Sequence, residues 1–181
     1  MDNLKIAAVC MHSIPGDVAC NLDKTEALAW EASANGAEYV CFPELSVTGY
    51  IQNCSDRIYG FEDMEKVVDR LAWIARNTKT ILMSGLIEVA DEGHPCITQI
   101  IAGPDGLIGA YRKTHLGPTE TAGYCPGEKI EVFRVGKTTF GVQLCYEAHF
   151  PEISTRMALM GADIVFIPLG EAWGMKTISA P

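Results

Sequence analysis

The sequence lacks any long apolar run, and none approaches the about 18 residues that a membrane-spanning helix needs. Its opening, MDNLKIAAVCM, has too short an apolar core and too early an acidic residue for a secretory signal. Basic residues are also few: 14 Lys and Arg, scattered along the chain, stand against 23 Asp and Glu, and the formal net charge is -9. Nucleic-acid binding needs clustered Lys and Arg and is therefore disfavoured. We expect a cytoplasmic protein that binds neither membranes nor nucleic acid.

The seven cysteines include no CxxC pair, and no Cys/His pair has the spacing of zinc ligands. Their odd number, with several inside apolar strand-like runs, indicates reduced thiols rather than a disulfide framework. We expect no metal and no cofactor. Internal repeats and low-complexity stretches are absent, and 181 residues with 48% hydrophobic content suit one globular domain, residues 1–181.

Strand-like and helix-like patterns alternate along the chain. Asn21 is a plausible cap for the first helix, and residues 105–106 (DG) predict a hairpin turn. The expected strands lie at 4–11, 39–43, 80–90, 95–103, 107–111, 129–135, 138–144 and 163–168, and the helices at 21–36, 61–77 and 151–162. The pattern favours an α/β fold with a mixed sheet that helices cover on one face. Strand 163–168 is apolar on both sides, so a second sheet is the natural cover for the other face.

Reactive side chains follow three of the predicted strands directly. Glu44 follows strand 39–43, Lys113 follows strand 107–111, and Cys145 follows strand 138–144. In open α/β sheets, ligands bind beyond the carboxyl ends of strands, so we expect these three residues to converge. Each also has a plainer interpretation: Glu44 as a turn cap, Lys113 as a solvated charge, and Cys145 as a small buried hydrophobic residue.

Together, the three residue types suit acyl transfer at a carbon bonded to nitrogen. A thiol is mostly protonated at neutral pH and needs a base, which Glu44 would supply. The Lys113 ammonium would favour the thiolate and then a developing oxyanion. No histidine is required, and we interpret His115 and His149 as structural or supporting residues.

Three segments, FPELSVTGY, YRKTHLGPTE and GVQLCYEAHFPEI, resemble the signature segments of the nitrilase superfamily, the carbon–nitrogen hydrolases, in the same order. The resemblance runs from Lys5 to about Trp173. It implies a four-layer α–β–β–α sandwich, with Glu44 as general base, Lys113 as transition-state lysine and Cys145 as nucleophile. Glu120, in TETAGYCPG, matches a further glutamate that in relatives orients the lysine and the reacting water.

The resemblance leaves the substrate open among small amides, N-carbamoyl compounds and nitriles. True nitrilases tend to carry tryptophan directly after the nucleophile, where this chain has Tyr146, so an amide or N-carbamoyl substrate is favoured. The backbone N–H of Tyr146 would join Lys113 in holding the oxyanion. An alternative is a catalytically silent module of the same fold that acts as an oligomer.

Family members usually continue for about half as many residues again, whereas this chain stops at SAP after strand 163–168. We therefore expect a C-terminally shortened version or a fragment, or a layer supplied by another copy. Strand 163–168 would become a sheet edge, and edges with apolar faces seek partners. A homodimer or larger assembly is expected, with Ile153, Met157 and Met160 near the contact.

Overall fold

The computed structural model describes residues 3–51, 64–89 and 94–170. Its strands and helices alternate first and then give way to hairpins, as predicted. The strands are β1 (Ile6–Ala8), β2 (Tyr39–Cys41), β3 (Ile81–Glu88), β4 (Cys96–Gly103), β5 (Gly106–Arg112), β6 (Val132–Val135), β7 (Thr138–Val142) and β8 (Ile164–Phe166). The helices are α1 (Val18–Ala34), α2 (Met64–Thr78), the short 3-10 helix η1 (Cys145–His149) and α3 (Pro151–Leu159).

The first sheet has the strand order β1-β2-β3-β4-β5. Strands β1, β2 and β3 are parallel, while β3, β4 and β5 form an antiparallel meander. Strands β2 and β5 therefore run in the same direction and end at the same edge. The predicted turn between β4 and β5 is confirmed, and Gly106 takes a φ of 123° there, which glycine tolerates at no steric cost.

The second sheet has the order β6-β7-β8, in which β6 and β7 form a hairpin and β8 lies parallel to β7. The prediction that strand 163–168 becomes a sheet edge is confirmed, because β8 pairs only with β7 among the described residues. The parallel pairing makes β7 and β8 end on the same side of the molecule. Cys145 follows the first of these strands and Gly170 follows the second.

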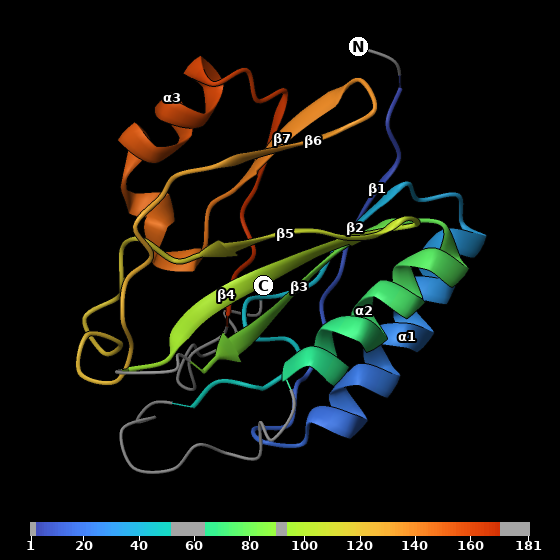
Figure 1. Ribbon diagram of the computed structural model, residues 1–181, viewed down its shortest axis with the longest axis horizontal. Helices are drawn as coiled ribbons and strands as arrows, with labels where there is room; N and C mark the ends of the chain where they lie inside the picture. Colours follow the sequence, from blue (N-terminus) through green and yellow to red (C-terminus); the bar gives the residue numbers. More distant parts are fainter. Residues whose placement is uncertain (1–2, 52–63, 90–93, 171–181) are drawn as a thin grey trace, which may run out of the picture.

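Four layers result, with α1 and α2 on one outside, the two sheets in the middle, and α3 on the other outside (Figure 1). Successive side chains of a strand point to opposite faces of its sheet, so each sheet can pack on a different layer on each side. In β2, Tyr39 faces the second sheet and contributes to a core with Phe140 and Phe166, whereas Val40 faces α1 and α2. The predicted α–β–β–α sandwich is confirmed.

Two element predictions were wrong in detail. Helix α1 begins at Val18 with Asp17 as its cap, so Asn21 lies inside the helix. The Asn21 side chain instead bonds to both backbone groups of Ile14 and to the Val47 carbonyl, at 2.8 to 2.9 Å. Strand β1 spans only three residues and is not buried, since Ile6 is 41% exposed at the sheet edge. The predicted start of the second helix, residues 61–63, lies outside the described residues.

The predicted contact residues of helix α3 also need correction. Ile153 and Met157 are fully buried inside the chain. Met157 packs against β7 so closely that a Cβ on Gly141 would lie 2.4 Å from the Met157 sulfur. Of the three residues, only Met160 is exposed. The apolar stripe of α3 is thus used by the fold itself.

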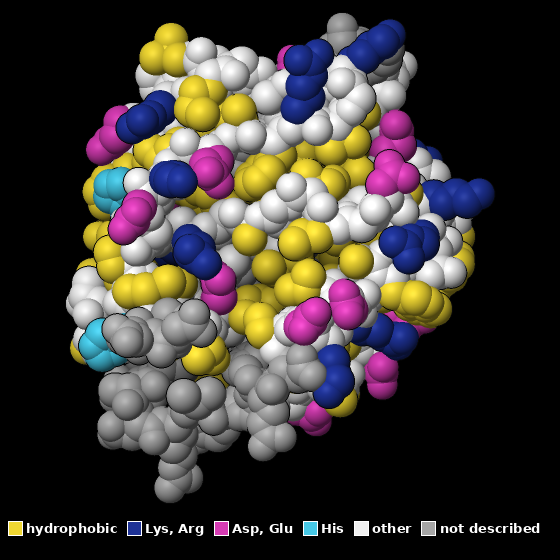
Figure 2. All heavy atoms as spheres, in the orientation of Figure 1, with side chains coloured by type: hydrophobic (Ala, Val, Ile, Leu, Met, Phe, Trp, Pro, Cys, Tyr) yellow, Lys and Arg dark blue, Asp and Glu magenta, His cyan; other side chains and the backbone are white. Residues whose placement is uncertain are grey.

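Charged residues are spread over the surface, and on the face in Figure 2 the Lys and Arg side chains are interspersed with Asp and Glu. Hydrophobic side chains occupy the spaces between them. Within the described ranges, no helix is both long enough and apolar enough to cross a membrane.

Candidate active site

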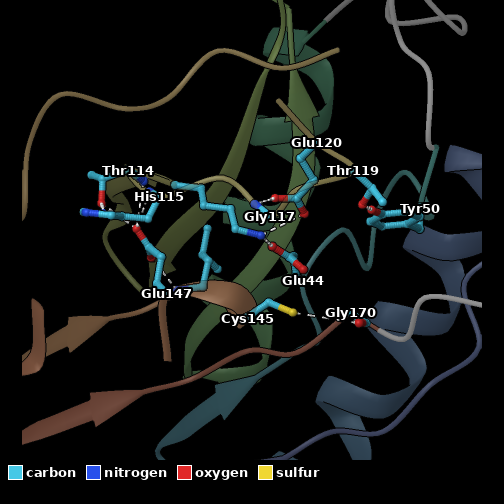
Figure 3. Close-up of polar contacts among 12 residues, drawn as sticks. Glu44, Tyr50, Thr114, His115, Gly117, Thr119, Glu120, Cys145, Glu147 and Gly170 are labelled. Atoms are coloured by element: carbon cyan, nitrogen blue, oxygen red, sulfur yellow. Dashed lines mark hydrogen bonds and ion pairs between the residues drawn. The ribbon is translucent and has the colours of Figure 1, made fainter. Parts of the chain in front are cut away.

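The carboxyl ends of β2, β5, β7 and β8 meet at one end of the two sheets, where Figure 3 shows the polar side chains that follow them. Glu44 follows β2, and Lys113 follows β5 directly, with its N–H donating to the Ile97 carbonyl at 2.9 Å. Cys145 follows β7 at the start of η1. The structure therefore brings together residues that lie far apart in the sequence, as the strand-end argument predicts.

Lys113 lies between two carboxylates in a buried ion-pair cluster. Its Nζ donates to Glu44 Oε1 at 2.7 Å and to Glu120 Oε1 at 2.9 Å. The Lys113 side chain is 0% exposed, and those of Glu44 and Glu120 are 1% and 6% exposed. The second Glu120 oxygen accepts from the Gly117 N–H at 2.6 Å, which fixes this carboxylate. Lys113 is therefore no solvated charge, and Glu44 does more than cap a turn.

Cys145 lies beside this cluster in an unusual backbone conformation. Its φ of 43° falls in the left-handed region, which costs a non-glycine residue about 1–3 kcal/mol. The Cys145 N–H donates to the Pro168 carbonyl at 2.9 Å, and the thiol points to the Gly170 carbonyl at 4.0 Å (Figure 3). Gly170 also packs on Glu44, because a Cβ there would lie 2.8 Å from Glu44 Oε2.

The ionisation of the site follows from its burial and charge. Burial raises the pKa of the Glu44 carboxyl above its ordinary value, although the Lys113 charge and a hydrogen bond with the Cys145 thiol oppose this. Burial also opposes the charged form of Lys113, but attraction and hydrogen bonds to Glu44 and Glu120 outweigh it and raise the Lys113 pKa. The ammonium thus keeps its proton.

The pKa of the Cys145 thiol is raised, first by burial and then by the negative charge of Glu44, which together outweigh the lowering effects of a backbone hydrogen bond with Gly170 and of the Lys113 charge. Lys113 does favour the thiolate, as expected, because its charge lowers the Cys145 pKa, but burial and the charge of Glu44 outweigh this effect. The site therefore favours the protonated thiol before a substrate is present.

A third buried carboxylate, Glu147, has no role predicted from the sequence. Its Oε1 accepts from the Thr114 N–H at 2.7 Å, the Thr114 hydroxyl at 2.6 Å and the Tyr111 hydroxyl at 3.0 Å. Its Oε2 accepts from the Leu144 N–H at 2.6 Å. Glu147 thus joins the residue before the candidate nucleophile to the residue after Lys113. The signal was present in the sequence, as an acidic residue inside an otherwise apolar strand-to-helix junction.

The side chains around Tyr146 form an aromatic cluster. The Tyr146 ring lies 5.2 Å from the His149 ring and 5.6 Å from the Phe150 ring, and the His115 ring lies 4.5 Å from the Phe150 ring. His115 Nδ1 also pairs with the Thr114 hydroxyl at 2.9 Å. A supporting role fits both histidines. A role of Tyr146 in substrate binding stays a prediction.

Within residues 3–51, 64–89 and 94–170, no group of three or more His, Cys, Asp or Glu side chains could hold a metal ion. The carboxylates of the site are instead directed at the ammonium of Lys113.

The sequence pattern of the carbon-nitrogen hydrolases matches residues 5–181, nearly the whole chain. The chain belongs to the carbon-nitrogen hydrolase family. A nitrilase from Pyrococcus abyssi is 35% identical over 171 residues, which cover 91% of this chain and 64% of the relative. An N-carbamoylputrescine amidase from Oryza sativa is 29% identical over 159 residues, covering 82% of this chain and 52% of the relative.

Among solved structures, an amidase from Nesterenkonia sp. AN1 superimposes on this carbon-nitrogen hydrolase chain with a TM-score of 0.84 at 30% identity. The superposition covers 97% of this chain and 70% of the amidase. That amidase carries the product of Michael addition of acrylamide at its active-site cysteine. The chain thus spans roughly half to two thirds of the curated relatives' length, in agreement with the shortened length expected from the sequence.

Proposed function

We propose that this chain hydrolyses a non-peptide carbon–nitrogen bond of a small amide or N-carbamoyl compound through a cysteine thioester. The observation that carries the proposal is the buried Lys113, held between Glu44 and Glu120 beside the Cys145 thiol. Burial of three ionised groups is costly unless they pair, and such clusters concentrate at functional sites. The amidase and N-carbamoylputrescine amidase relatives support this class of substrate.

In the proposed reaction, Glu44 takes the proton of the Cys145 thiol while the sulfur attacks the carbonyl carbon. Lys113 and the backbone N–H of Tyr146 stabilise the oxyanion. The tetrahedral intermediate collapses, the proton passes from Glu44 to the leaving nitrogen, and ammonia or an amine departs. A thioester on Cys145 remains. Glu44 then activates a water molecule, oriented by Glu120, which releases the acid and returns the proton to the thiol.

A nitrile substrate is the second candidate, because the nitrilase from Pyrococcus abyssi is 35% identical. The same thiol would add to the nitrile carbon. A third candidate is a silent module of the same fold. We also propose that the chain acts as a homodimer or larger assembly and needs neither metal nor cofactor.

Ammonia release tests the proposal. The purified chain is incubated with a short aliphatic amide, an N-carbamoyl amine and an aliphatic nitrile, beside a Cys145→Ala control. We expect ammonia from an amide or carbamoyl compound, none with Cys145→Ala, and an acyl adduct on Cys145 by mass spectrometry after acid quenching. Ammonia from the nitrile alone would support the second candidate. A folded chain that releases none from any substrate would support the silent module.

A further inference from the structure

Cys96 and Cys125 lie opposite each other on neighbouring backbone segments, away from the candidate active site. They form an isolated parallel bridge, and the Cys125 N–H donates to the Pro95 carbonyl at 2.9 Å. The pKa of the Cys96 thiol is raised first by burial and then by the neighbouring Cys125 thiol. Neighbouring strands lie about 4.8 Å apart. This spacing falls in the Cα separation of about 4.4–6.8 Å that a disulfide bond accepts.

Both cysteines line a cavity of about 750 Å³, together with Glu88, Arg112 and Lys129. Cys96 is 7% exposed, Cys125 is half-buried, and the Arg112 side chain at the cavity wall is 56% exposed. Arg112 is held there by a bidentate ion pair with Glu88, at 2.5 and 2.7 Å. A small molecule can therefore reach the thiol pair from solvent.

From this geometry, we propose that Cys96 and Cys125 form a reversible thiol–disulfide site that responds to small-molecule disulfides such as glutathione disulfide. The Cys125 thiolate attacks one sulfur of the reagent, forms a mixed disulfide and releases one thiol. The Cys96 thiol then loses its proton and attacks the Cys125 sulfur, which closes the protein disulfide and releases the second thiol. The two cysteines lose two electrons and two protons, and the reagent is reduced to two thiols.

The order of attack follows from the burial of the two cysteines. Cys125 is the more accessible thiol and meets the reagent first. Burial raises the pKa of Cys96 to about 12, so this thiol is protonated when the reagent arrives and does not compete with Cys125 for it. The second step is then intramolecular and is favoured by the enforced proximity of the two sulfurs.

The disulfide would fasten the segment that carries Glu120 to strand β4. This segment leaves β5 at Lys113 and returns at Gly127, whose N–H donates to the Lys113 carbonyl at 2.7 Å. A Cβ on Gly127 would lie 2.4 Å from the Arg112 carbonyl oxygen, so the two backbones already touch. Because a crosslink between Cys96 and Cys125 restricts the unfolded chain, the oxidised form should unfold at a higher temperature.

Peptide mapping tests the proposal. The reduced protein is incubated with glutathione disulfide, quenched in acid, alkylated with iodoacetamide and digested with trypsin. Trypsin cuts after Arg112 and Lys113, so the two cysteines fall on different peptides. We expect these peptides to be linked, and the melting temperature of the oxidised protein to rise by about 5 °C or more. Cys125→Ser should lose both effects, whereas Cys20→Ser, altered on the distant helix α1, should keep both.

Three results would each overturn the proposal. The first is alkylation of both Cys96 and Cys125 after oxidation, and the second is a glutathione adduct that persists on Cys125. The third is an equal rise in melting temperature for the wild type and Cys125→Ser.

Discussion

Lys113 carries one positive charge between the carboxylates of Glu44 and Glu120, so the cluster is net negative when both are ionised. A preformed thiolate at Cys145 would add a further negative charge to a buried site, which agrees with its raised pKa. In the proposed reaction, proton transfer to Glu44 would therefore be favoured only when a substrate carbonyl accepts the new charge next to Lys113. The thiol would then stay protonated until substrate binds.

Replacing Lys113 by methionine tests this arrangement. We expect Lys113→Met to lower turnover by about 10²–10³ or more, because an oxyanion donor is lost. It should also lower the free energy of unfolding by about 3–5 kcal/mol, because two buried carboxylates lose their partner. Ammonia release and urea unfolding measure the two effects. Lys129→Met, at an exposed lysine, is the control. Turnover close to that of the wild type would mean that a residue other than Lys113 stabilises the oxyanion.

The raised pKa of Glu44 predicts the acid limb of the pH profile. Glu44 must be ionised to accept the thiol proton, so kcat/KM should fall on acidification with a midpoint above the ordinary carboxyl value of 4.5. Because the folded state holds this proton more tightly than the unfolded state does, stability from Glu44 is lost as pH rises through the folded pKa. Activity that is flat down to pH 4.5 would contradict the assignment. Glu128→Gln, at an exposed carboxyl, should leave the profile unchanged.

At the scale of elements, helix α1 has two kinds of polar contact that should differ in their contribution to stability. One is a local cap at its start, and the other joins the helix to distant segments. Asp17→Ala removes one exposed cap bond to the Cys20 N–H and should cost about 1 kcal/mol. Asn21→Ala removes three bonds, and the buried Val47 carbonyl and the Ile14 N–H lose the partner that Asn21 gives them, so we expect a loss of about 2–4 kcal/mol. Urea unfolding of both variants checks the order. Equal losses would mean that Asn21 acts only locally.

Glu147 links β5 to the junction after β7, and its substitution tests that link. Glu147→Gln puts an amide N–H₂ among the N–H and O–H donors of Tyr111, Thr114 and Leu144, so we expect a loss of about 2–4 kcal/mol in unfolding free energy. If the variant folds, its turnover should fall, because the hydrogen bonds of Glu147 hold the backbone next to both Cys145 and Lys113. Urea unfolding and ammonia release measure both, with Glu128→Gln as the control. Unchanged stability would show that other contacts hold the junction.

The sequence alone predicts elements whose cause is local. The hairpin turn at residues 105–106 and the strand-end positions of Glu44, Lys113 and Cys145 follow from turn residues, periodicity and motif order. The four-layer order of the sandwich was instead implied by the resemblance to the carbon–nitrogen hydrolases. Other features depend on tertiary packing between the layers. These are the start of α1, the exposure of β1 and the burial of Met157. The carboxylate network of Glu147 likewise needs two sheets brought together, which no local pattern encodes.

At the scale of the whole molecule, two facing sheets bring strand ends from different layers to one site. Glu44 and Lys113 come from the first sheet, whereas Cys145 comes from the second. The relative position of the sheets therefore sets the distance between Glu44 and Cys145. The aromatic core of Tyr39, Phe140 and Phe166, with ring centroids 5.6 to 6.1 Å apart, joins the sheets and holds this position.

The end of α3 and the segments that follow α3 and β8 carry exposed apolar residues: Leu159 is 84% exposed, Met160 45%, Ile167 46% and Leu169 60%. Ile153 and Met157 cannot contribute to a contact there, because they are buried in the chain's own core. Since neighbouring exposed apolar side chains favour association, we expect the chain to self-associate through Leu159 and Met160. Leu159→Glu would place a charge at the centre of that contact and should shift the assembly towards the monomer.

Light scattering coupled to gel filtration, at low micromolar concentration, measures this shift. Leu107→Glu is the matched control, because Leu107 is 55% exposed but lies at the β4–β5 hairpin of the other sheet. We expect the wild type and Leu107→Glu to give the same assembly and Leu159→Glu to give a smaller one. A wild-type chain that is monomeric and fully active would contradict the expectation, because it would show that one copy builds the complete site alone.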